Sequence, residues 1–151
     1  MTTETTTRQS HAEAEIGELM AAREAALRAG DARLLSSHFT PDFVLFSLAP
    51  PLQQPVGPDE EGLRAWFATF DSAVDYEISE LAVTVDGDVA YCHSLDRMSA
   101  VPRGGDESFT LWFRATHGLR RVDGAWRIAH QHQSVPFAMD GSFAALLDLT
   151  P

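Results

Sequence analysis

The residues best suited to chemistry gather in one stretch, Ala125 to Phe137, which reads AWRIAHQHQSVPF. Its pattern is typical of an extended strand, in which successive side chains point to opposite faces. One face carries both histidines and the other carries both glutamines. The histidine face holds Trp126, Ile128, His130, His132 and Ser134, and the glutamine face holds Arg127, Ala129, Gln131, Gln133 and Val135. Which face lines a pocket decides which of these groups can meet a ligand.

His130 and His132 have a spacing that suits metal binding, because two imidazoles on one strand face can hold the same ion. A metal site needs a third ligand, and the neighbouring strands offer no matching aspartate or glutamate. The sequence therefore predicts no metal site, and nothing in it indicates a cofactor.

Two further histidines, His93 and His117, lie on other predicted strands, on faces that are otherwise apolar. A single histidine in such a place is often a hydrogen-bonded core residue, and it can also line a ligand site. These two histidines are the leading candidates for acid or base chemistry.

Arg23 lies on the inner stripe of the predicted first helix, where a buried guanidinium needs an anionic partner. No acidic residue is obvious on the facing strands. If Arg23 points inward, it joins a cationic pocket suited to a carboxylate or an enolate. The other members of that pocket would be Arg97, His93 and His117. In the alternative, the Arg23 side chain extends to the rim and pairs with a surface glutamate.

Helical and strand periods in the sequence predict how these groups are positioned. Helices are expected from His11 to Ala29, after Asp31 and from Pro58, and strands from Phe43 to Leu48, Val74 to Val85, Val89 to Val101, Ser108 to Arg121 and Ala125 to Phe137. The alternation slips between Ile78 and Leu81, which indicates a bulge. This order predicts an α+β fold in which three N-terminal helices cover one face of a mainly antiparallel sheet.

The two ends of the chain differ from its middle. Residues 1–10 are polar and rich in threonine, and we expect them to form a disordered tail. Residues 11–137 are expected to form one domain. Residues 138–151 are expected to be a C-terminal tail with a short helix that packs on the body.

The chain has 151 residues and a formal net charge of −11, which argues against nucleic acid and acidic membranes as partners. Cys92 is the single cysteine, so no disulfide can form within the chain. The N-terminal residues lack the apolar core of a signal peptide, and no apolar run approaches the ~20 residues that span a bilayer. These features predict a cytoplasmic protein.

Three motifs stand out along the chain: Ala-Gly-Asp at Ala29–Asp31, Gly-Asp-Val-Ala-Tyr at Gly87–Tyr91, and Arg-Val-Asp-Gly-Ala-Trp at Arg121–Trp126 leading into His-Gln-His-Gln-Ser. With these motifs, residues 11–137 resemble the SnoaL-like and ketosteroid-isomerase-like family of the nuclear transport factor two superfamily. The closing motif also resembles the association domain of calcium/calmodulin-dependent kinase II. The resemblance implies a cone-shaped fold with a strongly curved mixed sheet and a cavity between sheet and helices. It implies no single activity, because this superfamily hosts isomerases, cyclases, dehydratases, hydrolases and modules without chemistry.

Taken position by position, the resemblance argues against steroid isomerisation. The first-helix tyrosine of the isomerase falls on Arg23, its base on Ser47 and its buried aspartate on His117. A serine cannot act as a base unless a neighbour deprotonates it. Arginines that line the pocket of the kinase domain align with His93 and His117, which implies that both histidines line the cavity.

The turn before Ala125–Phe137 decides which residues of that strand face the cavity. A two-residue turn would put the two histidines on the side of His117, whereas a bulge would put Gln131 and Gln133 there. The resemblance favours the bulge, because an apolar pocket position of the isomerase aligns with Ala129. The outer sheet face would then hold His130, His132, Trp126, Trp112, Arg114 and Met98. In this fold such a face implies the interface of a homodimer.

The residues leave two functional hypotheses open. In the first, the protein is an enzyme of the isomerase, cyclase or dehydratase type that acts on a small, mostly apolar carbonyl or carboxylate compound. His117 would be its acid or base, and Arg23 or His93 would stabilise negative charge. The candidates for ligand binding are Arg97, Gln131, Trp66, Phe43, Ser47 and His132. In the second hypothesis, the protein is a non-catalytic module for ligand binding or oligomerisation.

Overall fold

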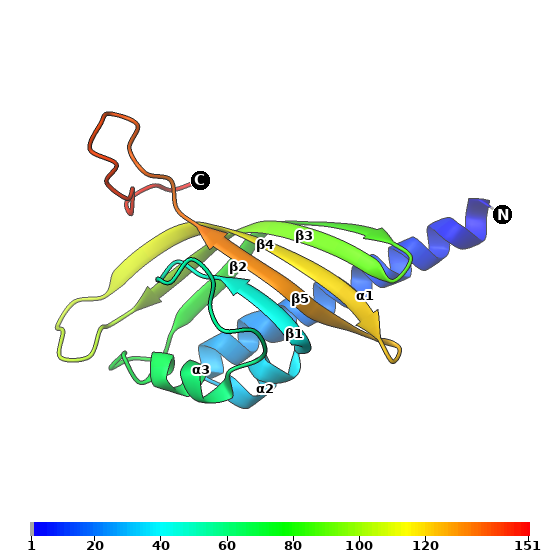
Figure 1. Cartoon of the computed structure of the whole chain (residues 1–151), viewed down its shortest axis with the longest axis horizontal. Coiled ribbons are helices and arrows are strands. Elements are labelled where there is room, and N and C mark those ends of the chain that lie inside the picture. The colour runs from blue at the N-terminus through cyan, green and yellow to red at the C-terminus, as the bar shows by residue number, and fades with distance from the viewer. Residues whose placement is uncertain (1) are drawn as a thin grey trace.

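The long N-terminal helix α1, Thr2–Ala29, runs along one face of the sheet (Figure 1). Its buried residues recur at helical spacing and include Ile16, Met20 and Leu27. Gly30 ends the helix with φ of 65°, a conformation that favours glycine. The prediction of a disordered tail over residues 1–10 is wrong for residues 2–10, because these residues extend the helix outward as exposed turns. The hydroxyls of Thr6 and Thr7 bond to carbonyl oxygens four residues back, which is compatible with a helix.

Residues 2–151 are described by the computed structural model, and within them three helices pack on a mixed sheet of five strands. The short helices α2, Ala32–Ser37, and α3, Glu60–Phe67, follow α1. Each begins with an aspartate cap. Asp31 accepts a hydrogen bond from the backbone N–H of Leu34 at 3.0 Å, and Asp59 accepts one from Gly62 at 2.9 Å. These caps fix the residues at which the two helices begin.

The strands run in the spatial order β1-β5-β4-β3-β2, so the curved sheet does not close (Figure 1). Their bounds are β1 Phe39–Phe46, β2 Asp75–Asp86, β3 Val89–Ala100, β4 Phe109–Val122 and β5 Ala125–Ser134. β1 is parallel to β5, and the remaining pairs are antiparallel. The α+β architecture and the antiparallel meander expected from the sequence are confirmed.

Two bulges set which side chains face the helices. The first lies in β2 between Ser79 and Ala82, where Glu80 has φ of 52°, and it confirms the slip read from the sequence. The second lies in β5, because Gly118 pairs with His130 while Leu119 pairs with Ile128. This second bulge brings Gln131 opposite His117.

The C-terminal residues 138–151 form an exposed loop that projects from the body (Figure 1). Phe137 makes a bridge with Ala145 and packs against Phe143, with ring centroids 5.8 Å apart. The short helix expected here does not form, and Phe143 is 67% exposed rather than packed on the body.

The space between helices and sheet holds two apolar clusters. The first lies under the middle of α1 and includes Ile16, Met20, Leu119, Trp126 and Ile128. The second lies toward α2 and α3 and includes Leu27, Leu35, Tyr76, Met98 and Phe113. No helix within residues 2–151 is long and apolar enough to cross a membrane.

Candidate functional site

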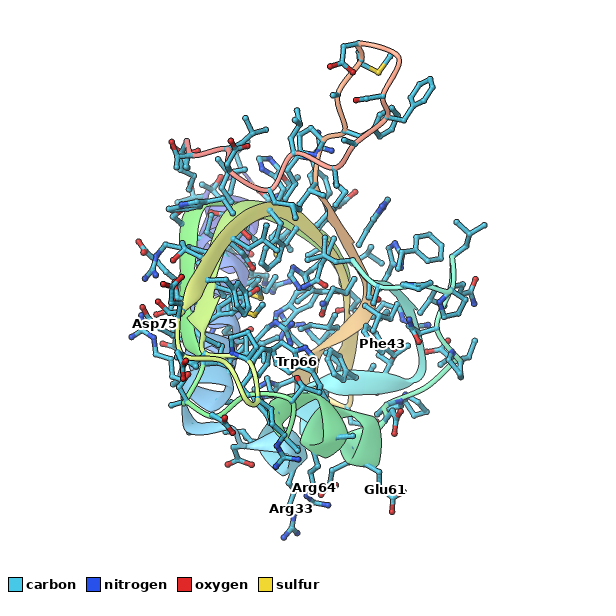
Figure 2. The ribbon with its side chains drawn as sticks, turned by 90° about the vertical axis from the view of Figure 1, so that its left-hand side faces the viewer. Arg33, Phe43, Glu61, Arg64, Trp66 and Asp75 are labelled. Carbon is cyan, nitrogen blue, oxygen red and sulfur yellow. The ribbon has the colours of Figure 1, made fainter. Side chains whose placement is uncertain are left out.

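A cavity of about 350 Å³ opens beside the second cluster, between the helices and the inner face of the sheet. Trp66 lies within the ring formed by the curved sheet and the helices, whereas the Arg33, Glu61 and Arg64 side chains point away from it (Figure 2). Much of the wall is apolar, and it includes Leu27, Leu35, Phe43, Leu63, Trp66 and Phe113. A volume of this size fits a small molecule with a mostly apolar skeleton.

Arg23 brings a positive charge to the cavity wall. Its side chain is 5% exposed, and its guanidinium carbon lies 5.8 Å from the centre of the Phe39 ring. Its Nε has no hydrogen-bond partner within residues 2–151, and no carboxylate in that range lies within ion-pair distance of the guanidinium. Of the two orientations left open for Arg23, the structure has the inward one and not the pairing at the rim. A buried cation in this state has lost water without gaining a direct ion pair.

Tyr76 and Asp96 form a hydrogen-bonded pair next to Arg23. The Tyr76 hydroxyl, which belongs to a residue that lines the cavity, donates to Asp96 Oδ2. The Ser94 hydroxyl donates to Asp96 Oδ1 at 2.6 Å. Asp96 is 0% exposed, and burial raises the pKa of its carboxyl, while both hydroxyls and the Arg23 charge oppose that rise. Burial, followed by the Asp96 charge, also raises the pKa of Tyr76 well above its usual value.

His117 lies on the inner face of β4 and is 1% exposed. Burial lowers the pKa of its imidazole to about 3, and the Arg23 charge adds to that effect. The neighbouring Gln131 amide acts in the opposite direction, but neither imidazole nitrogen meets the geometry of a hydrogen bond to the described residues. His117 is therefore neutral at physiological pH.

The expected site residues fall into separate groups. Arg23, Phe43, Ser47, Trp66 and Gln131 line the cavity, together with Gln133 from the same face of β5. His117 lies behind this wall rather than in it. The bulged alternative for the last hairpin is the one observed, since Gln131 is buried while His132 is exposed.

His93 and Arg97 do not reach the cavity, because they lie on the outer face of β3. The inner face of that strand carries the alternate residues, from Ala90 to Ala100. His93 is exposed, and Arg97 forms ion pairs with Glu77 at 3.1 Å and with Asp75 at 3.0 Å. The expected cationic pocket of four residues thus reduces to Arg23 at the cavity wall and a neutral His117 behind it.

The predicted outer face also needs correction. Met98 lines the cavity, and Trp126 is 5% exposed, with its Nε1 donating to Glu15 of α1 at 3.0 Å. Both were expected on the outer face. Trp112 and Arg114 alternate with the inward Phe113 and Ala115, so they lie outside as expected.

His132 does not line the cavity. It borders a shallow surface hollow formed mainly by residues 46–53, and its ring meets Phe46 edge-on at 5.4 Å. The neighbouring His130 Nδ1 lies 2.9 Å from the Val44 carbonyl oxygen. Within residues 2–151, no group of three or more potential metal ligands lies around either histidine or elsewhere.

Sequence reasoning missed Tyr76 and Asp96 because it assigned the wrong face of β3 to the cavity. The signal was present in the small and apolar residues that share the face of Asp96, namely Ala90, Cys92, Ser94, Met98 and Ala100. Histidines and arginines on the other face drew attention away from that pattern.

Comparisons with known proteins agree with this fold. An NTF2-like protein of unknown function from Pseudomonas putida is 32% identical, with a TM-score of 0.82 over 94% of this chain and 98% of that one. A Novosphingobium aromaticivorans protein with the provisional name of scytalone dehydratase is 16% identical, with a TM-score of 0.76 over 100% and 99%. A Xanthomonas campestris protein with the provisional name of a calcium/calmodulin-dependent protein kinase II association domain is 18% identical, with a TM-score of 0.68 over 89% and 88%. At 16% and 18% identity these two likenesses show the fold alone.

No curated protein matches the chain. The model of the SnoaL-like domain matches residues 16–138, which include every residue that lines the cavity. The chain therefore belongs to the SnoaL-like family and has the NTF2-like fold.

Proposed function

We propose that this protein binds a small, mostly apolar molecule whose anionic carboxylate or polar carbonyl oxygen lies against Arg23. The observation that carries the proposal is the buried Arg23 guanidinium at the cavity wall, with no anion of the described chain paired to it. A ligand oxygen would supply the missing partner, and a charged oxygen would supply it most strongly.

The test compares two probes that share one skeleton, 4-phenylbutanoate and 4-phenylbutanamide, by isothermal titration calorimetry. The acid should bind more tightly than the amide, and Arg23→Met should weaken acid binding by about 100-fold, as expected for loss of a charge-assisted contact. The matched control is Arg33→Met, which removes an exposed arginine of α2 and should leave affinity unchanged. Equal affinity of wild type and Arg23→Met for the acid would reject the proposal.

Catalysis of the isomerase, cyclase or dehydratase type is a second candidate function. Arg23 favours it, because the same guanidinium can stabilise an enolate that develops during proton transfer. His117 has less support as acid or base, since it lies behind the cavity wall and its lowered pKa makes it a weak base. Two distant structural neighbours have names that include a dehydratase, but those names describe those proteins. For this chain they support dehydratase chemistry only by likeness of fold.

Proton exchange distinguishes an enzyme from a binding module. The C3 protons of 2-oxo-4-phenylbutanoate can be followed by NMR in D₂O. An enzyme should accelerate their replacement by deuterium, and Arg23→Met should remove that acceleration. Binding without any acceleration would favour the non-catalytic module.

We also propose that the protein forms a homodimer through the outer sheet face. Trp112 lies on this face, and Tyr91 there is 52% exposed, so aromatic surface is available for an interface. Light scattering after size exclusion should give twice the 16.5 kDa chain mass for the wild type. Trp112→Glu should shift the mass to that of a single chain, and a wild-type monomer would contradict the proposal.

A further inference from the structure

We propose that the ligand is a hydroxy acid, with its carboxylate against Arg23 and its hydroxyl donating a hydrogen bond to the oxygen of Tyr76. This inference rests on the proposed function and names the substrate class of the same cavity. It comes from the hydrogen-bonding roles that the polar residues of the wall leave open.

The Tyr76 hydroxyl has committed its hydrogen to Asp96. Asp96 Oδ2 accepts from Tyr76, and Asp96 Oδ1 accepts from Ser94 at 2.6 Å, so each carboxylate oxygen holds one hydroxyl donor. If Tyr76 turned its hydrogen toward the cavity, a carboxylate oxygen with 0% exposure would lose its partner. Tyr76 therefore presents lone pairs to a ligand, and the ligand group that meets it must be a donor.

Gln131 adds a polar group on a different wall of the cavity. The residue is 5% exposed and lines the cavity, but its Oε1 is fully buried and its amide acts on the neighbouring His117. Gln131 belongs to β5 and Tyr76 to β2, and β4 and β3 lie between these strands in the sheet. The Tyr76 oxygen is therefore the acceptor for a ligand donor, whereas Arg23 requires an acceptor.

One molecule satisfies both demands if it carries an anionic oxygen and a hydroxyl. A simple carboxylic acid would satisfy Arg23 and leave the Tyr76 oxygen without a donor. A simple alcohol would leave the Arg23 charge unpaired. The apolar remainder of the wall, which includes Leu27, Leu35 and Trp66, indicates that the rest of the ligand is hydrocarbon.

The test uses 4-phenylbutanoate as parent, its 2-, 3- and 4-hydroxy derivatives, and the methyl ether of each, titrated into the full chain by calorimetry. One hydroxy isomer should bind about tenfold more tightly than the parent, as expected for one added hydrogen bond. Its methyl ether, which cannot donate, should lose that gain. Tyr76→Phe should also remove the gain, so that this variant binds the hydroxy isomer no more tightly than it binds the parent. Tyr91→Phe, which alters an exposed tyrosine of β3, should keep the gain.

Two results would overturn the inference: every hydroxy isomer binding within twofold of the parent, or the ethers binding as tightly as the alcohols. If the parent binds through Arg23 and these results appear, the substrate class fails while the proposed function stands. If neither the parent nor any derivative binds, both fail. If Tyr76→Phe does not fold, the comparison of alcohols with ethers on the wild type still decides whether the ligand hydroxyl donates a hydrogen bond.

Discussion

The two halves of the space between α1 and the sheet are built in opposite ways. Under the middle of α1, Ile16 and Ile128 are both 0% exposed within a closed apolar cluster. Toward its C-terminal end, the same helix presents Arg23 to a cavity of about 350 Å³. The closed half gains free energy by packing, whereas the hollow half gives up packing and holds a buried charge. The difference indicates that the hollow half has been kept for a purpose other than stability.

Ile128→Ala tests the closed half and should have the largest effect on stability. Truncation of a fully buried isoleucine leaves a hole in a well-packed cluster, so the free energy of unfolding should fall by about 3–4 kcal/mol. Urea unfolding followed by circular dichroism measures the change. A loss below about 1 kcal/mol would show that this half is not tightly packed.

Arg23→Met tests the hollow half and should have the opposite sign. It replaces a buried guanidinium without an anionic partner by an apolar side chain of similar length, so the free energy of unfolding should rise by about 1–3 kcal/mol. The same urea experiment measures it. Destabilisation by a similar amount would mean that Arg23 serves the fold, and the contrast between the halves would disappear.

His117 lies between the two halves, and its titration should appear in the pH dependence of stability. Its pKa in the folded state is about 3, below the usual 6.5 of a histidine, so the unfolded chain takes up the proton first as the pH falls. Its neutral form in the folded protein therefore costs stability progressively below pH 6.5, by up to about 1.4 kcal/mol per pH unit. Between pH 7 and pH 5 the wild type should lose about 2 kcal/mol relative to His117→Leu. A difference that does not vary with pH would contradict the buried, neutral imidazole.

Arg97→Met should have the smallest effect, because its ion pairs lie on the outer sheet face. The partners Asp75 and Glu77 are themselves well exposed, and such pairs contribute about 0–1 kcal/mol. Affinity for 4-phenylbutanoate should remain within twofold of wild type by calorimetry. A tenfold loss of affinity would place Arg97 at the ligand after all.

Much of the fold could be read from the sequence because its signals are local. Gly30 and the aspartate caps mark helix ends, and alternating residues with two-residue turns mark the meander. The N-terminal turns of α1 were missed because exposed threonines carry no apolar period. The C-terminal loop was misread because three apolar residues suggested a helix that the chain does not form.

The site was harder to predict because the face of the sheet on which a residue lies depends on how its strand pairs with the neighbouring strands. The alternation of β3 is compatible with either face toward the helices, and only its register with β2 and β4 decides that Asp96 is inside and Arg97 outside. The bulge in β5 reverses which alternate residues of that strand point toward the helices, so Trp126 and Gln131 both point inward. The position of Arg23 on the inner stripe of α1 could be predicted because helical spacing alone places it there.

The Nε–H signal of Arg23 in a ¹⁵N NMR spectrum tests the central claim most directly. Addition of 4-phenylbutanoate should shift this signal in a saturable way, with the midpoint that calorimetry gives, while 4-phenylbutanamide should shift it less at equal occupancy. A signal that stays in place while the acid saturates the protein would show that the ligand binds elsewhere, and it would contradict the account of the cavity.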